Sequence, residues 1–222
     1  MVQNKYNEII LSIACLSAIF ALLFWGAFTN ELNFEWIVFS ILVATIVMLM
    51  YHLIFKFLAT KYDYVHTHEF VGKGALISLF VALFHMPVVT LSREQLNSTF
   101  SEKYVVRDYD KRRIGYVYLL GNEIYLLFLL FMLLFQGISS SFFEYLFLGG
   151  MVFSFWQIAP VISLTYIKIK GIKTPFLRLF MLYGMWLLIL ICGLFQIEYL
   201  LLLAFFIVIF DILLLRHKLT NL

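Results

Sequence analysis

The feature that most constrains this chain is a series of apolar runs long enough to cross a lipid bilayer. A hydrocarbon core about 30 Å thick needs roughly 20 helical residues to span it. Six such runs lie at 8–28, 36–57, 115–136, 143–166, 176–195 and 197–215. With 64% hydrophobic residues and a mean hydropathy of +0.97, the chain is far more apolar than a soluble domain, whose apolar share is about half. We therefore expect a polytopic membrane protein.

A seventh apolar run, 74–91, is shorter, and the charges that follow it indicate how it sits. Cytoplasmic loops of membrane proteins carry an excess of Lys and Arg. If 74–91 crossed completely, the basic segment from Arg93 to Arg113 would be external, against this rule. If the run enters and returns, all 16 Lys and Arg are cytoplasmic. We therefore predict a re-entrant or interfacial segment at 74–91. Its break at His85–Val89 either faces the bundle interior or kinks a helix lying in the interface.

The prediction for the whole chain is an all-α polytopic membrane protein, a single domain over 1–222 with six spans. The segment 74–91 and a cytoplasmic loop over 92–114 complete the predicted architecture. We expect the protein to lie in the cell membrane, with both termini in the cytoplasm. The lipid bilayer is thus the first partner. The net charge of +3 arises in loops beside the spans, so it indicates topology rather than nucleic-acid binding.

Two carboxylates are expected inside the membrane, Glu123 in the third span and Asp211 in the sixth. Such groups are costly there and are functional candidates by default. Glu123 can instead serve packing, and Asp211, five residues before Arg216, can simply reach toward the interface or a basic neighbour. A small transporter that uses Glu123 and Asp211 is one hypothesis, although the sequence has no internal repeat of the kind many transporters show.

A group of metal-ligand residue types follows the second span: His66, His68 and Glu69, with His85 as a further candidate. Imidazole and carboxylate groups are suitable zinc ligands. On a strand the two His would share a face, whereas on a helix they would not. An interfacial loop cluster and a metal site therefore both remain open. A metal-dependent membrane enzyme with a His-rich site is a second hypothesis.

The residues from 51 to 70, YHLIFKFLATKYDYVHTHEF, resemble a segment of the site-2 protease family of intramembrane zinc metalloproteases, especially its compact archaeal members. In that family a helix with the motif HExxH is followed by Lys, Ala, a Tyr-Gly turn and an Ala-Glu-Phe strand. The residues in register with these are Lys56, Ala59, Tyr62, Glu69 and Phe70.

Three later stretches are similar to family motifs in the same order. Residues 86–89 (MPVV) resemble its Pro-Gly-Ala-Val stretch, and 114–122 (IGYVYLLGN) resemble its Gly-x-Ile-x-Leu-Ala-Gly-Pro-x-x-Asn helix. Residues 157–168 resemble its Asn-Leu-Leu-Pro-x-x-x-Leu-Asp-Gly-x-Lys segment. The likeness covers about 36–190 and implies a site-2-protease-like core.

The departures from the family pattern fall on its chemistry. In HExxH two His bind zinc and the Glu activates the metal-bound water. In this register Tyr51 replaces the first His, His52 the Glu and Phe55 the second His, while Thr165 replaces the Asp that is the third ligand. Tyr and Thr are poor zinc ligands and Phe cannot bind the ion. The resemblance therefore implies a degenerate site without zinc, without a cofactor and without peptidase activity.

A fold that has lost its catalytic residues can still keep the groove that held a substrate helix. The first hypothesis is therefore a pseudoprotease that acts as a binding or scaffold subunit for another membrane protein or a second copy of itself. The candidate groove or partner-binding residues are Pro87, Asn122, Glu123 and Pro160.

Overall fold

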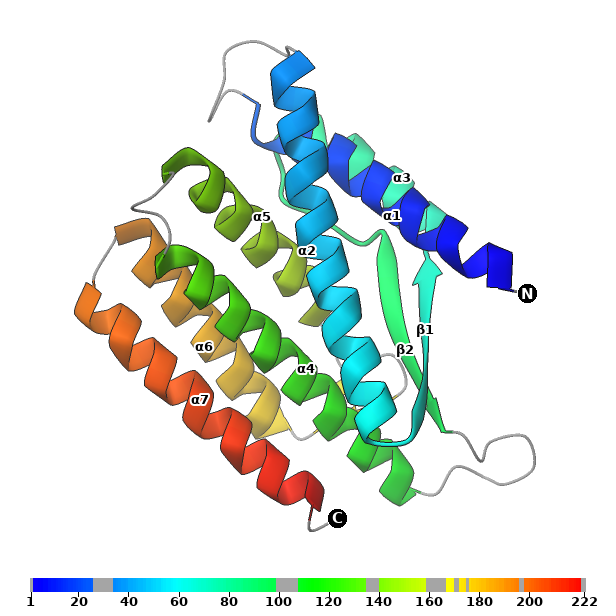
Figure 1. The fold of residues 1–222 in the computed structure, drawn as a ribbon, viewed down its shortest axis with the longest axis vertical. Coiled ribbons are helices and arrows are strands. Elements are labelled where there is room, and N and C mark those ends of the chain that lie inside the picture. Colours follow the sequence, from blue (N-terminus) through cyan, green and yellow to red (C-terminus); the bar gives the residue numbers. More distant parts are fainter. Residues whose placement is uncertain are drawn as a thin grey trace.

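The computed structural model describes residues 2–25, 34–98, 108–134, 140–158, 167–169, 172–174, 176–195 and 198–220. Seven helices and two antiparallel two-stranded sheets make up this part of the chain (Figure 1). The helices are α1 (Val2–Leu23), α2 (Phe34–Lys61), α3 (Gly72–Ala82), α4 (Asp108–Leu134), α5 (Ser140–Ile158), α6 (Phe176–Phe195) and α7 (Glu198–Thr220). The strands are β1 (Tyr64–Phe70), β2 (Ser92–Ser98), β3 (Ile167–Ile169) and β4 (Ile172–Thr174).

Five of these helices are long and apolar enough to cross a membrane, which identifies the chain as an integral membrane protein with five candidate spans. They are α1, α2, α4, α6 and α7. The sixth expected span, 143–166, corresponds to α5, but α5 ends at Ile158 and its described apolar part is shorter than the other five. The prediction of six spans is therefore confirmed for five helices, and residues 159–166 lie outside the described ranges.

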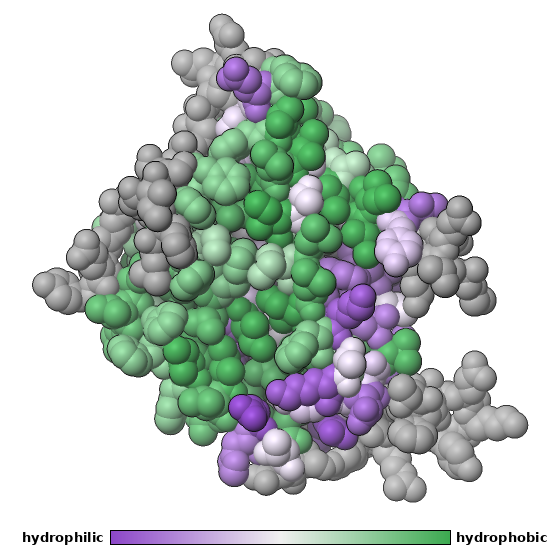
Figure 2. Space-filling view, in the orientation of Figure 1, coloured by the Kyte–Doolittle hydropathy of each residue, from purple (hydrophilic) through white to green (hydrophobic). Residues whose placement is uncertain are grey.

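The visible face of the molecule carries a wide apolar region, with its larger hydrophilic region at one end (Figure 2). Figure 2 shows apolar side chains over most of the visible face, with hydrophilic residues gathered at the end where α2 and α7 finish and the β1–β2 sheet lies. Large side chains such as Phe57, Phe80 and Phe206 are more than 60% exposed. A soluble monomer rarely exposes so much apolar surface, whereas in a bilayer such residues simply contact lipid.

The expectation of an all-α fold is wrong after α2, where the chain forms a sheet. β1 pairs antiparallel with β2, so that His66 lies opposite Leu96 and His68 opposite Glu94. β1 is rich in the aromatic and β-branched residues that favour strands. β2, with the sequence SREQLNS, lies in the expected cytoplasmic loop 92–114, whose end instead belongs to α4. Its strand conformation depends on pairing with β1, which the local sequence does not reveal.

Between these strands the chain leaves the sheet and comes back to it. α3 runs outward, the chain turns at residues 83–86, where His85 has a φ of 55°, and Val71 N–H donates to the Leu91 carbonyl at 2.8 Å. The 11 residues of α3 extend about 16 Å, half of a bilayer core. The two ends of the segment therefore lie together at the sheet, an arrangement that a re-entrant segment would need. Its depth in a bilayer stays a prediction.

Candidate metal centre

Strand geometry places His66 and His68 on one face of β1, because side chains two residues apart on a strand point to the same side. His68 is opposite Glu94 in the register, and the Glu94 side chain is only 2% exposed. Glu69 points to the other face, where Arg93 and Gln95 donate to its carboxylate. The sheet thus brings two imidazoles and one buried carboxylate together.

A third imidazole comes from α2. His52 Nδ1 lies 3.6 Å from Glu94 Oε2, and the His52 and His66 ring centroids are 4.7 Å apart. His66 Nε2 is 2.5 Å from the same Glu94 oxygen, while His68 Nδ1 is 2.7 Å from Glu94 Oε1. Three histidines from two elements therefore surround one carboxylate, and we name His52, His66, His68 and Glu94 the histidine–glutamate cluster.

Two further side chains hold this cluster in place. The hydroxyl of Ser12, on α1, lies 2.8 Å from His68 Nε2. If His68 Nδ1–H donates to Glu94, its Nε2 is free to accept the Ser12 proton. Tyr118, on α4, donates its phenolic O–H to the Glu94 backbone carbonyl. Elements α1, α2, α4, β1 and β2 therefore all contribute to fixing one carboxylate.

The charge state of Glu94 follows from these contacts. Burial alone would raise its pKa, but the interactions with His52, His66 and His68 outweigh burial and hold the pKa of Glu94 well below its usual value. Glu94 is therefore an ionised carboxylate at neutral pH. Buried charges of this kind in proteins are paired or coordinate metal ions.

The spacing of three ligand atoms is compatible with one metal ion. One ligand atom each from His52, His66 and Glu94 lies within 4.8 Å of the other two. Zinc binds His nitrogen and carboxylate oxygen at roughly 2.0–2.2 Å, so two ligands of one ion are at most about 4.4 Å apart. The 3.6 Å separation of His52 Nδ1 from Glu94 Oε2 is within this limit. The 2.5 Å contact of His66 Nε2 with the same oxygen is a hydrogen bond, which must open before both atoms bind one ion. His52 Nδ1 is also buried without a hydrogen-bond partner among the described residues, as expected of a nitrogen available to a metal.

The sequence predicted this site only in part. His66 and His68 lie together as their spacing on a strand requires, and His52 joins them although it was assigned to the degenerate motif. Glu94 was missed, because it lies 26 residues beyond His68 in a polar segment that reaches the cluster only through strand pairing.

Two metal candidates from the sequence do not join the cluster. Glu69 is on the opposite face of the sheet, 2.6 Å from Arg93 Nη2. His85 is exposed at the end of the α3 segment, where its Nδ1 lies 3.3 Å from the Leu23 carbonyl. The expectation that they share a site with His66 and His68 is corrected for both residues.

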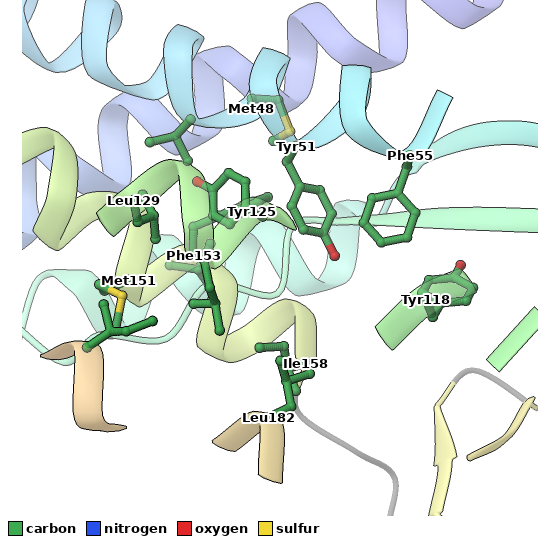
Figure 3. Packing of buried hydrophobic residues seen from close by; sticks show 14 of the residues in the cluster. Met48, Tyr51, Phe55, Tyr118, Tyr125, Leu129, Met151, Phe153, Ile158 and Leu182 are labelled. Atoms are coloured by element: carbon green, nitrogen blue, oxygen red, sulfur yellow. The ribbon is translucent and has the colours of Figure 1, made fainter. Parts of the chain in front are cut away.

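The positions that the resemblance assigns to the zinc motif are filled by aromatic packing (Figure 3). Tyr51 and Phe55 are almost completely buried, with ring centroids 4.8 Å apart. Tyr51 also packs edge-on against Tyr125 and Phe153, each at 5.2 Å, and its hydroxyl donates to Asn122 Oδ1 at 3.1 Å. Within the described ranges, aromatic rings thus occupy the space where Tyr51 and Phe55 face α4. Thr165 lies outside the described residues.

The candidate groove residues have separate surroundings. Pro87 is exposed, and its carbonyl accepts a hydrogen bond from the Trp156 indole. Asn122 is buried against Tyr51, whereas Glu123, the next residue on α4, approaches α6 and α7. Pro160 lies outside the described residues. The described members of this set therefore do not line one groove.

An apolar cavity of about 660 Å³ lies elsewhere, between α1 and α2. Its lining is almost entirely apolar and includes Ile13, Ala14, Ala18 and Ile41. The hydroxyl of Ser17, which also lines it, donates to the Ile13 carbonyl. It shares no residue with the candidate groove or with the histidine–glutamate cluster.

The chain matches no protein-family model, no curated protein and no solved structure. Its likeness to the site-2 proteases therefore stays a prediction that depends on the motifs quoted above. The geometry of the histidine–glutamate cluster does not depend on that likeness.

Proposed function

We propose that this chain is a membrane protein that binds one divalent transition-metal ion, zinc in the first instance, through His52, His66 and Glu94. The observation that carries the proposal is the convergence of three imidazoles on one buried carboxylate, with His52 Nδ1 buried and without a hydrogen-bond partner in the described part of the chain. Two His and one carboxylate are also the ligand set of catalytic zinc sites, which keep a fourth position open.

His68 and Ser12 are positioning residues in this proposal. His68 holds Glu94 Oε1, so that Oε2 is turned toward His52 and His66. Ser12 in turn holds the other nitrogen of the His68 ring. Metal ligands in proteins are commonly oriented by such outer partners.

The reaction class that this ligand set supports is metal-assisted hydrolysis. A zinc ion with an open position lowers the pKa of its bound water to about 7. The chain supplies two imidazoles and one carboxylate to hold the ion. The β1–β2 sheet, which carries His66 and Glu94, lies at the hydrophilic end of the visible face (Figure 2). His52, whose side chain is 15% exposed, is the most accessible member.

A second proposal concerns the aromatic cluster around Tyr51. We propose that the chain is a site-2-protease-like protein without peptidase activity at the position of that family's zinc motif, and that it serves as a subunit of a membrane complex. The packing of Tyr51 and Phe55 supports the loss of that site. Its partner would be another membrane protein or a second copy. Gentle solubilisation followed by crosslinking should yield a stoichiometric partner or a homo-oligomer, and a strictly monomeric chain would contradict this role.

We further propose that the protein lies in the cell membrane with both termini in the cytoplasm. The described basic residues support this orientation, because the Lys and Arg at the ends of α2 and α7 and near the start of α4 lie at one end of the bundle (Figure 1). They include Lys61, Arg112, Arg113, Arg216 and Lys218. Cytoplasmic placement of this end follows from the excess of Lys and Arg found there in membrane proteins.

Metal analysis of the purified protein tests the metal site directly. After removal of metal with a chelator and reloading with zinc, the wild type should retain one zinc per chain. His66→Ala and Glu94→Gln should lose it, whereas His85→Ala, which changes a histidine outside the cluster, should retain it. Cobalt loading gives an independent readout, because a four-coordinate cobalt spectrum should appear in the wild type and disappear in His66→Ala. A wild type that binds no metal, or variants that bind as the wild type does, would refute the proposal.

A further inference from the structure

Three ionisable side chains from three membrane helices, α4, α6 and α7, lie near one another. Arg178, on α6, donates to the Asp211 carboxylate on α7. Glu123, on α4, is 1% exposed, and Asp211 and Arg178 are the charged groups that act on it. These helices pack against one another. The three residues form a polar site separate from the histidine–glutamate cluster, which is built on β1, β2 and α2.

The hydrogen bonding of this site is incomplete. Glu123 Oε2 is buried and has no hydrogen-bond partner among the described residues. Arg178 is engaged directly by Asp211, and no described basic residue forms an ion pair with Glu123. A buried carboxylate oxygen without a donor is costly, so Glu123 needs a further species to satisfy it.

A count of charges identifies that species. With Arg178 protonated and both carboxyls ionised, the site carries a net charge of −1 inside the membrane, where an uncompensated charge is strongly disfavoured. Two neighbouring carboxylates also repel each other, so that one of them favours its protonated form. One added proton brings the net charge to zero and lets one carboxyl donate a hydrogen bond to the other.

We propose that Glu123, Asp211 and Arg178 form an intramembrane site that binds one proton, carried by Glu123. Asp211 stays ionised because Arg178 pairs with it, and Glu123 is the acid because it lacks such a partner among the described residues. Release of the proton leaves one negative charge, which a fresh proton or another monovalent cation must compensate. The site is thus suited to taking up and releasing a proton within the bilayer, the step on which proton-coupled transport depends.

Infrared spectroscopy tests the proton assignment without relying on any assay of function. At pH 7 the wild type in lipid nanodiscs should show the C=O band of a protonated carboxyl, which shifts in heavy water. Glu123→Gln should remove this band. Glu144→Gln, which changes a carboxyl on α5 outside the site, should leave it intact, and Asp211→Asn should move its frequency because the hydrogen-bond partner changes.

The wild-type spectrum by itself can overturn the proposal, even if a variant fails to fold. The absence of a protonated-carboxyl band at pH 7 would overturn it, as would a band that persists in folded Glu123→Gln. A band that vanishes on addition of sodium at constant pH would assign the site to a metal cation and overturn the proton as its ligand. Proton uptake into proteoliposomes that is lost in Glu123→Gln and kept in Glu144→Gln would extend the site to transport.

Discussion

At the scale of single residues, the chemistry of this chain depends on where a few polar side chains find partners. Glu94 is buried with three imidazoles, and Glu123 is buried beside another carboxyl. The first arrangement stabilises the ionised form of Glu94, and the second leaves Glu123 Oε2 without a hydrogen-bond donor among the described residues. Two glutamates of the same chain are therefore suited to different ligands, a metal ion and a proton.

His68→Ala should weaken metal binding without abolishing it. His68 contacts Glu94 through Oε1 and not through Oε2, the oxygen close to His52 and His66, and loss of such an outer partner typically costs 10–100-fold in affinity. A zinc titration against a competing chelator measures the change. Ser12→Ala should have a smaller effect. A full loss of binding in folded His68→Ala would instead identify His68 as a direct ligand.

The metal-free protein should lose stability in acid through Glu94. Its pKa is lowered on folding, so the stability it contributes is fully present above the unfolded value of about 4.3. This contribution is lost as the pH falls through the lower pKa of the folded state. The thermal midpoint of the wild type should therefore drop more steeply below pH 4 than that of Glu94→Gln. Parallel acid profiles would contradict the assignment.

At the scale of elements, glycines set how closely helices and the returning segment can approach. A Cβ on Gly74, in α3, would lie 2.0 Å from the Thr90 carbonyl oxygen, which is backbone and cannot rotate away. A Cβ on Gly121, in α4, would lie 2.7 Å from the tip of the Phe55 ring. Gly74 thus lets α3 pack closely against the backbone of Thr90, and Gly121 lets the Phe55 ring of α2 pack closely against α4.

Gly74→Ala should destabilise the protein, because the added methyl group forces α3 to move away from the backbone of Thr90. Overpacking of this kind typically costs about 1–3 kcal/mol. Gly184→Ala is the matched control, since a Cβ there meets nothing within 4 Å and alanine favours helix. Thermal unfolding in detergent should show a lower midpoint for Gly74→Ala alone. Equal midpoints for the two variants would contradict the close approach of α3 to Thr90.

Gly121→Ala should also destabilise the protein, and a smaller residue at position 55 should relieve it. The Phe55 ring has little room to move, because Tyr51 and Tyr118 pack against it at 4.8 and 5.2 Å. A double-mutant cycle with Phe55→Leu measures the coupling, which should be about 0.5–3 kcal/mol for residues in contact. Additive effects would mean that Phe55 and Gly121 are not in contact.

At the scale of the whole molecule, the membrane character could be predicted, because hydropathy is a property of the local sequence. The sheet could not, because β2 is polar and gains its strand conformation from pairing with a segment some 26 residues earlier. Glu94 was missed for that reason. Likewise the sequence marked Glu123 and Asp211 separately, but only the packing of α4, α6 and α7 brings them to Arg178.

The central claim is that His52, His66 and Glu94 hold one metal ion, and X-ray absorption at the zinc edge tests it most directly. The zinc-loaded protein should show only nitrogen and oxygen neighbours at roughly 2.0–2.2 Å, with the outer-shell signature of two imidazole rings. His52→Ala should reduce that signature to one ring or lose the metal. A protein that retains no zinc after loading, or a first shell containing sulfur, would contradict the account.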